Sequence, residues 1–150
     1  RSPMFTIEKM SPSMLEEVLE MVGEFYQSSA VSHPVPMEVL ERTFEAAVSE
    51  DPVLTGYVLK EEAEIVGFAY ITTFYACEVG GKCLMLEEIH IKKKARGKGY
   101  GTAFIKWVIG QHRDVKRVRL EVTADNERAI ALYKSLGFQF LDYGQMALEL

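Results

Sequence analysis

The feature that most constrains this chain is a basic, glycine-rich segment at 92–102, which reads Lys-Lys-Lys-Ala-Arg-Gly-Lys-Gly-Tyr-Gly-Thr. An apolar, strand-like run precedes it and a helical pattern follows it. Glycine lets successive backbone N–H groups converge on an anion, and a helix N-terminus adds partial positive charge. The whole chain carries a net charge of −5 at pH 7. The local excess of cations therefore favours a ligand with several phosphates.

Two common phosphate-binding motifs do not fit this segment. It contains no G-x-x-x-x-G-K-[ST] sequence, so it is not a P-loop. A G-x-G-x-x-G dinucleotide fingerprint fails because its third glycine would fall on Thr102 or Phe104. The spacing that fits is [Q/R]-x-x-G-x-[G/A], filled by Arg96, Gly99 and Gly101. Such a short pattern recurs by chance, and a solvated basic loop before a helix is the alternative.

A second motif lies at 126–138, which reads Asn-Glu-Arg-Ala-Ile-Ala-Leu-Tyr-Lys-Ser-Leu-Gly-Phe. It resembles the N-x-x-A-x-x-L-Y-x-x-x-G-F segment of the GNAT superfamily of N-acetyltransferases, and the first motif resembles the acetyl-CoA loop of the same superfamily. The two motifs occur in the family's order and at its usual separation. The resemblance covers roughly residues 54–138.

The resemblance and the hydrophobic periodicity together predict one α/β domain over residues 4–150. Residues 1–3 are interpreted as a cloning remnant before a native Met4. We expect the order β-α-α-β-β-β-α-β-α-β-β, a mixed sheet of about seven strands with four helices. The expected strands are 5–10, 56–60, 65–75, 83–92, 115–123, 138–143 and 145–150, and the expected helices are 11–28, 37–49, 99–112 and 126–136.

Composition narrows the function further. An acidic chain is not typical of nucleic-acid binding. No apolar run is long enough to cross a bilayer, and no signal peptide is evident, so we expect a cytoplasmic protein without membrane association. The two cysteines, Cys77 and Cys83, have no histidine nearby at ligand spacing. We therefore expect no metal site.

The resemblance implies which residues bind acetyl-CoA. The loop backbone and Arg96 would contact the phosphates, a strand edge would pair with the pantetheine arm, and Asn126 would hold the cofactor nearby. These residues are Ile89, His90, Ile91, Arg96, Gly97, Lys98, Gly99, Tyr100, Gly101, Thr102 and Asn126. Tyr133 would place its phenol near the leaving thiolate. Alternatives are a helix N-cap for Asn126, a core position for Tyr133 and a plain strand position for His90.

An amine acceptor is mostly protonated at neutral pH, so the chemistry needs a base. The candidates, in order of preference, are Glu87, Glu88 and Glu121. Glu87 matches the place of a water-activating glutamate in polyamine acetyltransferases, and Glu121 matches a proposed base in peptide N-terminal acetyltransferases. Neighbouring strand residues point to opposite faces, so only one of Glu87 and Glu88 should face the cleft unless a bulge intervenes. For each of these glutamates, the alternative to a catalytic role is a plain position on a solvent-exposed strand face.

The sequence therefore predicts direct transfer of an acetyl group from acetyl-CoA to the primary amine of a small, cationic acceptor. In this family the acceptor pocket is built largely from the first two helices and the loop between them, here about 24–35. Alternative functions are a non-catalytic CoA or acyl-CoA sensor, or acetylation of a protein lysine or N-terminus. A homodimer is plausible for the family.

Overall fold

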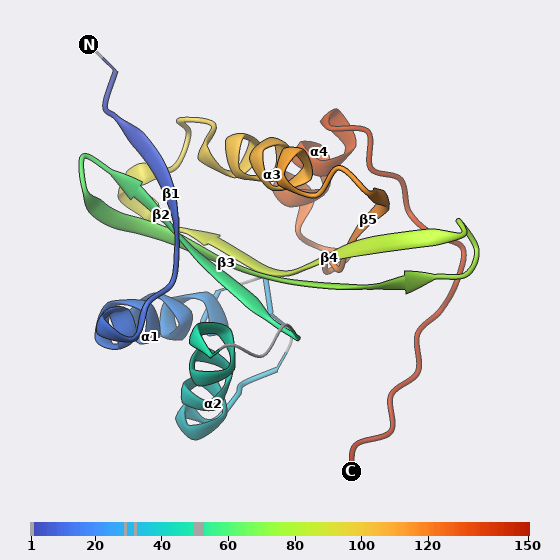
Figure 1. Cartoon of the computed structure of the whole chain (residues 1–150), viewed down its shortest axis with the longest axis horizontal. Helices are drawn as coiled ribbons and strands as arrows, with labels where there is room; N and C mark the ends of the chain where they lie inside the picture. Colours follow the sequence, from blue (N-terminus) through green and yellow to red (C-terminus); the bar gives the residue numbers. More distant parts are fainter. Residues whose placement is uncertain (1, 29, 32, 50–52) are drawn as a thin grey trace.

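The structure is a computed structural model that describes residues 2–28, 30–31, 33–49 and 53–150. Its one sheet has five strands in the order β1-β2-β3-β4-β5, antiparallel except for the parallel pair β4–β5 (Figure 1). The elements are β1 (Phe5–Lys9), α1 (Leu15–Tyr26), α2 (Met37–Val48), β2 (Thr55–Glu61), β3 (Glu64–Ala76), β4 (Gly81–Ile91), α3 (Tyr100–Gln111), β5 (Val115–Leu120) and α4 (Glu127–Ser135), with short 3-10 helices η1 (Pro12–Met14) and η2 (Lys93–Ala95).

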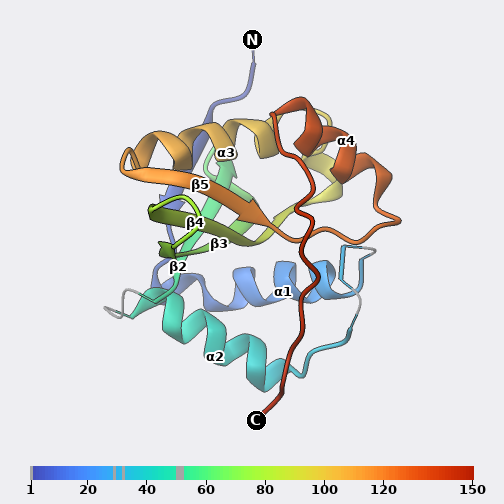
Figure 2. The ribbon, with the colours of Figure 1, turned by 90° about the vertical axis from the view of Figure 1, so that its right-hand side faces the viewer.

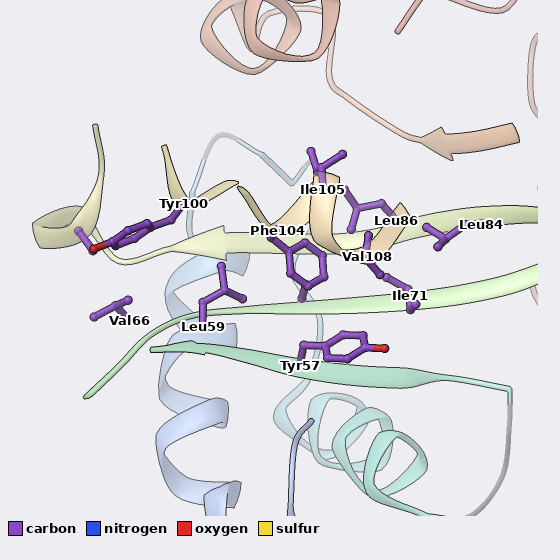
Figure 3. Close-up of a cluster of buried hydrophobic side chains, with 12 residues drawn as sticks. Tyr57, Leu59, Val66, Ile71, Leu84, Leu86, Tyr100, Phe104, Ile105 and Val108 are labelled. Carbon is purple, nitrogen blue, oxygen red and sulfur yellow. The ribbon is translucent and has the colours of Figure 1, made fainter. Parts of the chain in front are cut away.

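The sheet lies between two helical layers, with α1 and α2 on one face and α3 and α4 on the other (Figure 2). Each face has its own apolar core. Phe104, Ile105 and Val108 of α3 pack on one face of the strands (Figure 3). Val18 and Phe25 of α1 pack on the opposite face. The separation of helices to both faces matches the expected α/β architecture.

A β-bulge in β4 determines which residues face each helical layer. In the register with β3, Glu88 pairs with Tyr70 and Leu86 pairs with Ile71, which leaves Glu87 as the extra residue. Leu86 therefore faces the α3 core, and so does Ile89, three positions later. A regular strand would have put these two on opposite faces.

The parallel pair β4–β5 ends early. Its last paired residues are Leu86 and Leu120, although β4 continues to Ile91. The two strands part at this point, immediately before Glu87 and Glu121. Beyond the bulge, the side of β4 opposite β3 therefore has no neighbouring strand in the described chain.

The C-terminal segment corrects the expectation of seven strands. Helix α4 ends near Gly137, whose φ of +98° allows the chain to turn sharply. In residues 138–150 apolar side chains recur at roughly every second position, with a break at Phe140-Leu141, but the segment forms no strand in the described chain. The Tyr143 hydroxyl donates to the Glu78 carboxylate at the β3–β4 turn. Alternation predicts which side chains could share a face, but a strand also needs a neighbour to pair with, and no described strand pairs with this segment.

The helix boundaries show smaller differences. Ser11 and Pro12 begin a 3-10 turn rather than an α-helix, and Ser11 makes no side-chain cap. Among the described residues, no helix combines the length and apolar character needed to span a bilayer.

Phe68 and Phe74 provide a matched test of the core on a single strand, β3. The Phe68 side chain is 0% exposed and Phe74 is 41% exposed. We expect Phe68→Ala to lower the free energy of unfolding by about 3–5 kcal/mol because it leaves a cavity beneath α1. Phe74→Ala should cost less than about 1 kcal/mol. Urea unfolding followed by circular dichroism measures both, and equal losses would contradict this packing.

Candidate active site

The glycine loop between β4 and α3 has an open backbone. Gly97 and Gly99 both adopt φ +80°, a left-handed conformation that favours glycine. A Cβ built on either would meet no atom within 4 Å, so an incoming group can approach both. Gly99 is the N-cap of α3 and supplies no side chain to satisfy the first N–H groups of the helix. These donors and the helix dipole together form a cradle for an anion.

The cations of the loop are held by acidic residues near the β2–β3 turn. Lys98 lies 2.7 Å from Glu61, and Lys94 pairs with Glu64. The hydrogen bond from Lys98 is the largest cause that lowers the pKa of Glu61 below its usual value. Arg96 donates from Nε to the Ile91 carbonyl at 2.9 Å. The lysine pairs are exposed and therefore weak, so a phosphate could replace the carboxylates.

A cavity of about 460 Å³ lies where β4 and β5 part. Its walls come from the end of α1 and the loop after it, the bulged stretch 86–89 of β4, the stretch 120–123 after β5, and α4. The glycine loop follows the end of the same strand, β4. The strand that borders the cavity, β4, thus leads along the chain to the anion cradle.

All three candidate glutamates line this cavity, Glu87 and Glu88 from the bulge and Glu121 from the end of β5. Glu87 still reaches solvent, but partial desolvation raises its pKa, and the negative charge of Glu121 raises it further. The bulge explains how the adjacent Glu87 and Glu88 can both border one cavity. The alternation rule, taken without the bulge, would have admitted only one of them.

Glu88 is the more buried carboxylate. The Tyr26 hydroxyl at the end of α1 donates a hydrogen bond to Glu88 Oε2. Burial raises the pKa of Glu88 and outweighs the lowering effect of this hydrogen bond. Tyr70, opposite Glu88 on β3, is buried, and its hydroxyl has no hydrogen-bond partner among the described residues. Sequence reasoning missed Tyr70, because nothing in its apolar strand marks a polar contact.

His90 and Trp107 take structural positions. The His90 ring is buried against Phe25 and Phe68, and its Nε2 lies 3.5 Å from Glu24. Burial is the main cause that lowers the pKa of His90, which favours a neutral ring. Its side chain does not line the cavity. Trp107 packs edge-on against Tyr57 in the α3 core.

Asn126 and Tyr133 border the cavity from the α4 side. Asn126 Oδ1 accepts a hydrogen bond of 3.3 Å from the backbone N–H of Ala129, so it caps α4. Tyr133 packs against Phe138, with ring centroids 5.8 Å apart, and burial raises its pKa. Asn126 therefore caps α4, Tyr133 packs against Phe138, and both side chains also line the cavity.

Comparison with known proteins agrees with this geometry. The family model described as "Acetyltransferase (GNAT) family" matches residues 15–138. The chain belongs to this family. It is therefore a GNAT-type N-acetyltransferase domain, and its two motifs occupy the loop before α3 and helix α4.

Three relatives illustrate the family. The chain is 27% identical to the uncharacterized N-acetyltransferase YjgM of Escherichia coli over 89% of this chain and 78% of that protein. It is 28% identical to the mouse thialysine N-epsilon-acetyltransferase over 83% and 78% of the two chains. It is 33% identical to a probable spermine N(1)-acetyltransferase of Bacillus subtilis subsp. natto over 53% and 55%.

Solved structures share the fold. A possible acetyltransferase from Clostridium difficile 630 superposes with a TM-score of 0.81 at 20% identity, over 97% of both chains. The aminoglycoside N-acetyltransferase AAC(6')-Iy, solved in complex with CoA, superposes with a TM-score of 0.76 at 16% identity, over 99% of this chain and 97% of that one.

The environment of Glu88 predicts a pH-dependent effect on stability. Because its folded pKa is raised, ionised Glu88 destabilises the fold above that pKa, and the penalty disappears below the unfolded pKa. Glu88→Gln keeps an acceptor for Tyr26 without the charge. We expect its melting temperature to exceed that of the parent at pH 8 and to match it at pH 4. The exposed Glu45→Gln is the control. If Glu88→Gln is less stable than the parent at pH 8, this assignment is wrong.

Proposed function

We propose that this chain transfers an acetyl group from acetyl-CoA directly to the primary amine of a small, cationic acceptor within a ternary complex. The observation that carries the proposal is the group of three carboxylates, Glu87, Glu88 and Glu121, in the cavity where β4 and β5 part. An acceptor in this cavity lies beside the strand that leads to the glycine cradle.

The cofactor site follows from two open backbone features. The cradle at Gly97 to Thr102 suits a pyrophosphate, with Arg96 and the loop lysines as neighbouring cations. The edge of β4 at Ile89 to Ile91 has no neighbouring strand on the side of β5 in the described chain, so an extended pantetheine arm could add to it as a strand would. Acetyl-CoA supplies the acetyl group as a thioester.

The carboxylates would bind and deprotonate the acceptor. An alkylammonium has a pKa of about 10.4, so the acceptor binds as a cation. It then loses its proton so that the neutral amine can attack the thioester. Glu87 is our first choice as base because it borders open space, and its raised pKa brings its basicity closer to neutral pH. Glu88, held by Tyr26, would attract the cation, and Glu121 would add to the negative potential. A backbone N–H of the 89–91 edge would stabilise the oxyanion.

Tyr133 is the proposed acid for the leaving thiolate. It lines the cavity from α4, and burial raises its pKa, so the phenol keeps its proton. Thiolate is a tolerable leaving group, because a free alkyl thiol has a pKa of about 8.5, so this help should be modest. Asn126 stands on the same side and would contact the cofactor near the loop after β5.

The relatives' names support a small cationic acceptor. Two are named for thialysine and spermine, which are both amines. The alternatives are a CoA sensor and a transferase for protein lysine or N-termini. The sensor is disfavoured by the presence of Tyr133 and the carboxylates at one cavity, and a cavity of about 460 Å³ suits a small molecule. A cytoplasmic location and a homodimer also stay proposals.

The acceptor prediction can be tested by thiol release from acetyl-CoA with spermidine, thialysine, an aminoglycoside, free amino acids and a lysine peptide. We expect release with small cationic amines, and a loss of about 10²–10⁴-fold in kcat/KM for Glu87→Gln. Glu45→Gln on the surface of α2 should retain full activity.

The pH profile of kcat/KM identifies the base. A base must be ionised, so the rate should fall as pH drops through the raised pKa of Glu87, and Glu87→Gln should lose this acidic limb. If Glu87→Gln leaves both rate and profile unchanged, another group is the base. CoA binding without release from any amine would support the sensor.

The cradle prediction compares two glycines that both have open space where a Cβ would lie but differ in backbone conformation. Gly99 has φ +80° and Gly110 lies within α3, and a Cβ at either meets nothing within 4 Å. Gly99→Ala forces an unfavourable conformation worth about 1–2 kcal/mol, so we expect roughly tenfold weaker CoA binding by calorimetry. Gly110→Ala should stabilise the helix and leave CoA affinity unchanged. Equal affinities for the two variants would place the pyrophosphate elsewhere.

A further inference from the structure

The carboxylates of the cavity between β4 and β5 have no cationic partner within the described ranges. Of the described residues that line this cavity, Glu87, Glu88 and Glu121 are acidic, and none is lysine, arginine or histidine. None of the ion pairs in the described chain involves these three glutamates. The described protein therefore leaves the negative charge of the cavity unbalanced.

Carboxylates at the surface of the same domain have cationic partners. At the β2–β3 turn, Glu61 accepts a hydrogen bond from Lys98, which lowers the pKa of Glu61. Lys94 lowers the pKa of Glu64 in the same way. Inside the cavity, burial raises the pKa of two of the carboxylates, and a neighbouring glutamate raises each of them further. An incoming cation is the counter-charge that the cavity lacks.

The N-terminus of α4 borders the cavity but offers no strong site for an anion. Asn126 fills the cap itself, because its Oδ1 accepts a hydrogen bond from the N–H of Ala129. Glu127 lies in the first turn of the helix, where its negative charge offsets the positive end of the helix dipole. A carboxylate that entered the cavity would therefore meet like charges and no cation among the described lining residues.

Glu88 and Glu87 differ in how firmly they are held. The Tyr26 hydroxyl donates a hydrogen bond to Glu88 Oε2, and the Tyr26 ring packs edge-on against the buried Phe25, with ring centroids 5.2 Å apart. Glu87 is the extra residue of the bulge, and no side-chain hydrogen bond holds it in the described chain. A fixed carboxylate suits a charge that stays in place during the reaction. The adjacent aromatic faces also favour a cation there.

On the basis of the proposed function, we infer that the acceptor is an aliphatic diamine or polyamine that carries no carboxylate. One of its ammonium groups binds Glu88 beside Tyr26, and another amine reacts next to Glu87. Glu88 is thus a specificity-determining residue, and Tyr26 is a positioning residue that holds it. A monoamine leaves one of these carboxylates without a counter-charge, and an amino acid adds a carboxylate to a cavity that already has three.

The reaction is the acetyl transfer of the proposed function. The neutral nitrogen forms a bond to the acetyl carbon, the carbon–sulfur bond breaks, and CoA leaves with the electron pair as a thiolate. The reacting ammonium loses two protons in all. One leaves through Glu87, and the other replaces the proton that Tyr133 gives to the thiolate. The acetylated product keeps its second ammonium group at Glu88.

Acceptors of equal chain length test the inference. 1,5-Diaminopentane, pentylamine and lysine share a five-carbon chain that ends in a primary amine, and 1,4-diaminobutane, butylamine and ornithine share a four-carbon chain. At one length or both, we expect kcat/KM for thiol release to be roughly tenfold or more higher with the diamine, mainly through a lower KM. A monoamine or an amino acid that equals the diamine at both lengths would overturn the inference.

The role of Glu88 is tested by a ratio of two acceptors. In Glu88→Gln, the ratio of kcat/KM for the diamine to that for the monoamine should fall to about one, because the charge that binds the second ammonium is gone. Tyr26→Phe should lower this ratio by a smaller factor, and Tyr75→Phe, at an exposed tyrosine of β3, should keep the parent ratio. A loss of rate with an unchanged ratio in Glu88→Gln would make Glu88 a general base and overturn the inference.

Calorimetry separates this inference from the proposed function. If no acceptor releases thiol, the proposed function fails, and binding of the same acceptors in the presence of CoA still decides the specificity. We expect the diamine to bind about tenfold or more tightly than the monoamine and the amino acid, and Glu88→Gln to lose this difference. Equal affinities for the three acceptors would overturn the inference even where acetyl transfer proceeds.

Discussion

The parting of β4 and β5 is the constraint on which the rest of this structure depends. Parallel pairing holds the two strands together as far as Leu86 and Leu120 and then stops. Three consequences follow from this one event. The edge of β4 loses its neighbour, a cavity opens between the strands, and the next residue on each strand, Glu87 and Glu121, borders that cavity. The acidic character of the site is thus a result of where the pairing ends.

The bulge at Glu87 divides β4 into two stretches with different neighbours. Before it, β4 is an ordinary central strand between β3 and β5. After the bulge, β3 is the only partner strand of β4 in the described chain. The bulge also reverses the alternation of side chains along β4. As a result, Ile89 and Ile91 face the α3 core, and Glu88 and His90 face α1. Bulges cost pairing energy and change the direction of a side chain. Here the bulge brings Glu87 and Glu88 to the same cavity.

The sequence predicts most of this fold because its strong signals are local. The apolar periodicity places the four helices and the first five strands to within a few residues, and the glycine pattern places the loop before α3. The prediction of two C-terminal strands is wrong, because strand formation depends on a neighbouring strand that periodicity cannot specify. The Tyr26–Glu88 hydrogen bond joins residues 62 positions apart, and no local pattern marks such a contact. The bulge, which leaves Glu87 accessible, also depends on how β4 pairs with β3, and no local pattern in the sequence marks it.

The distribution of charge supports the proposal that one small domain binds both an anion and a cation. The loop cations are paired with Glu61 and Glu64 across exposed, weak contacts, so a polyphosphate can replace those carboxylates easily. Within the described chain, the hydrogen bond that holds Glu88 comes from a phenol and not from a cation. Desolvation without a counter-charge raises the pKa of Glu87 and Glu88 and leaves both carboxylates able to bind a cation.

An ammonium group is the counter-charge that would suit these carboxylates, and its binding would lower their pKa again. In the proposed site, the lower pKa on acceptor binding would make Glu87 a weaker base. Proton removal therefore favours a carboxylate that stays partly desolvated while the acceptor is bound.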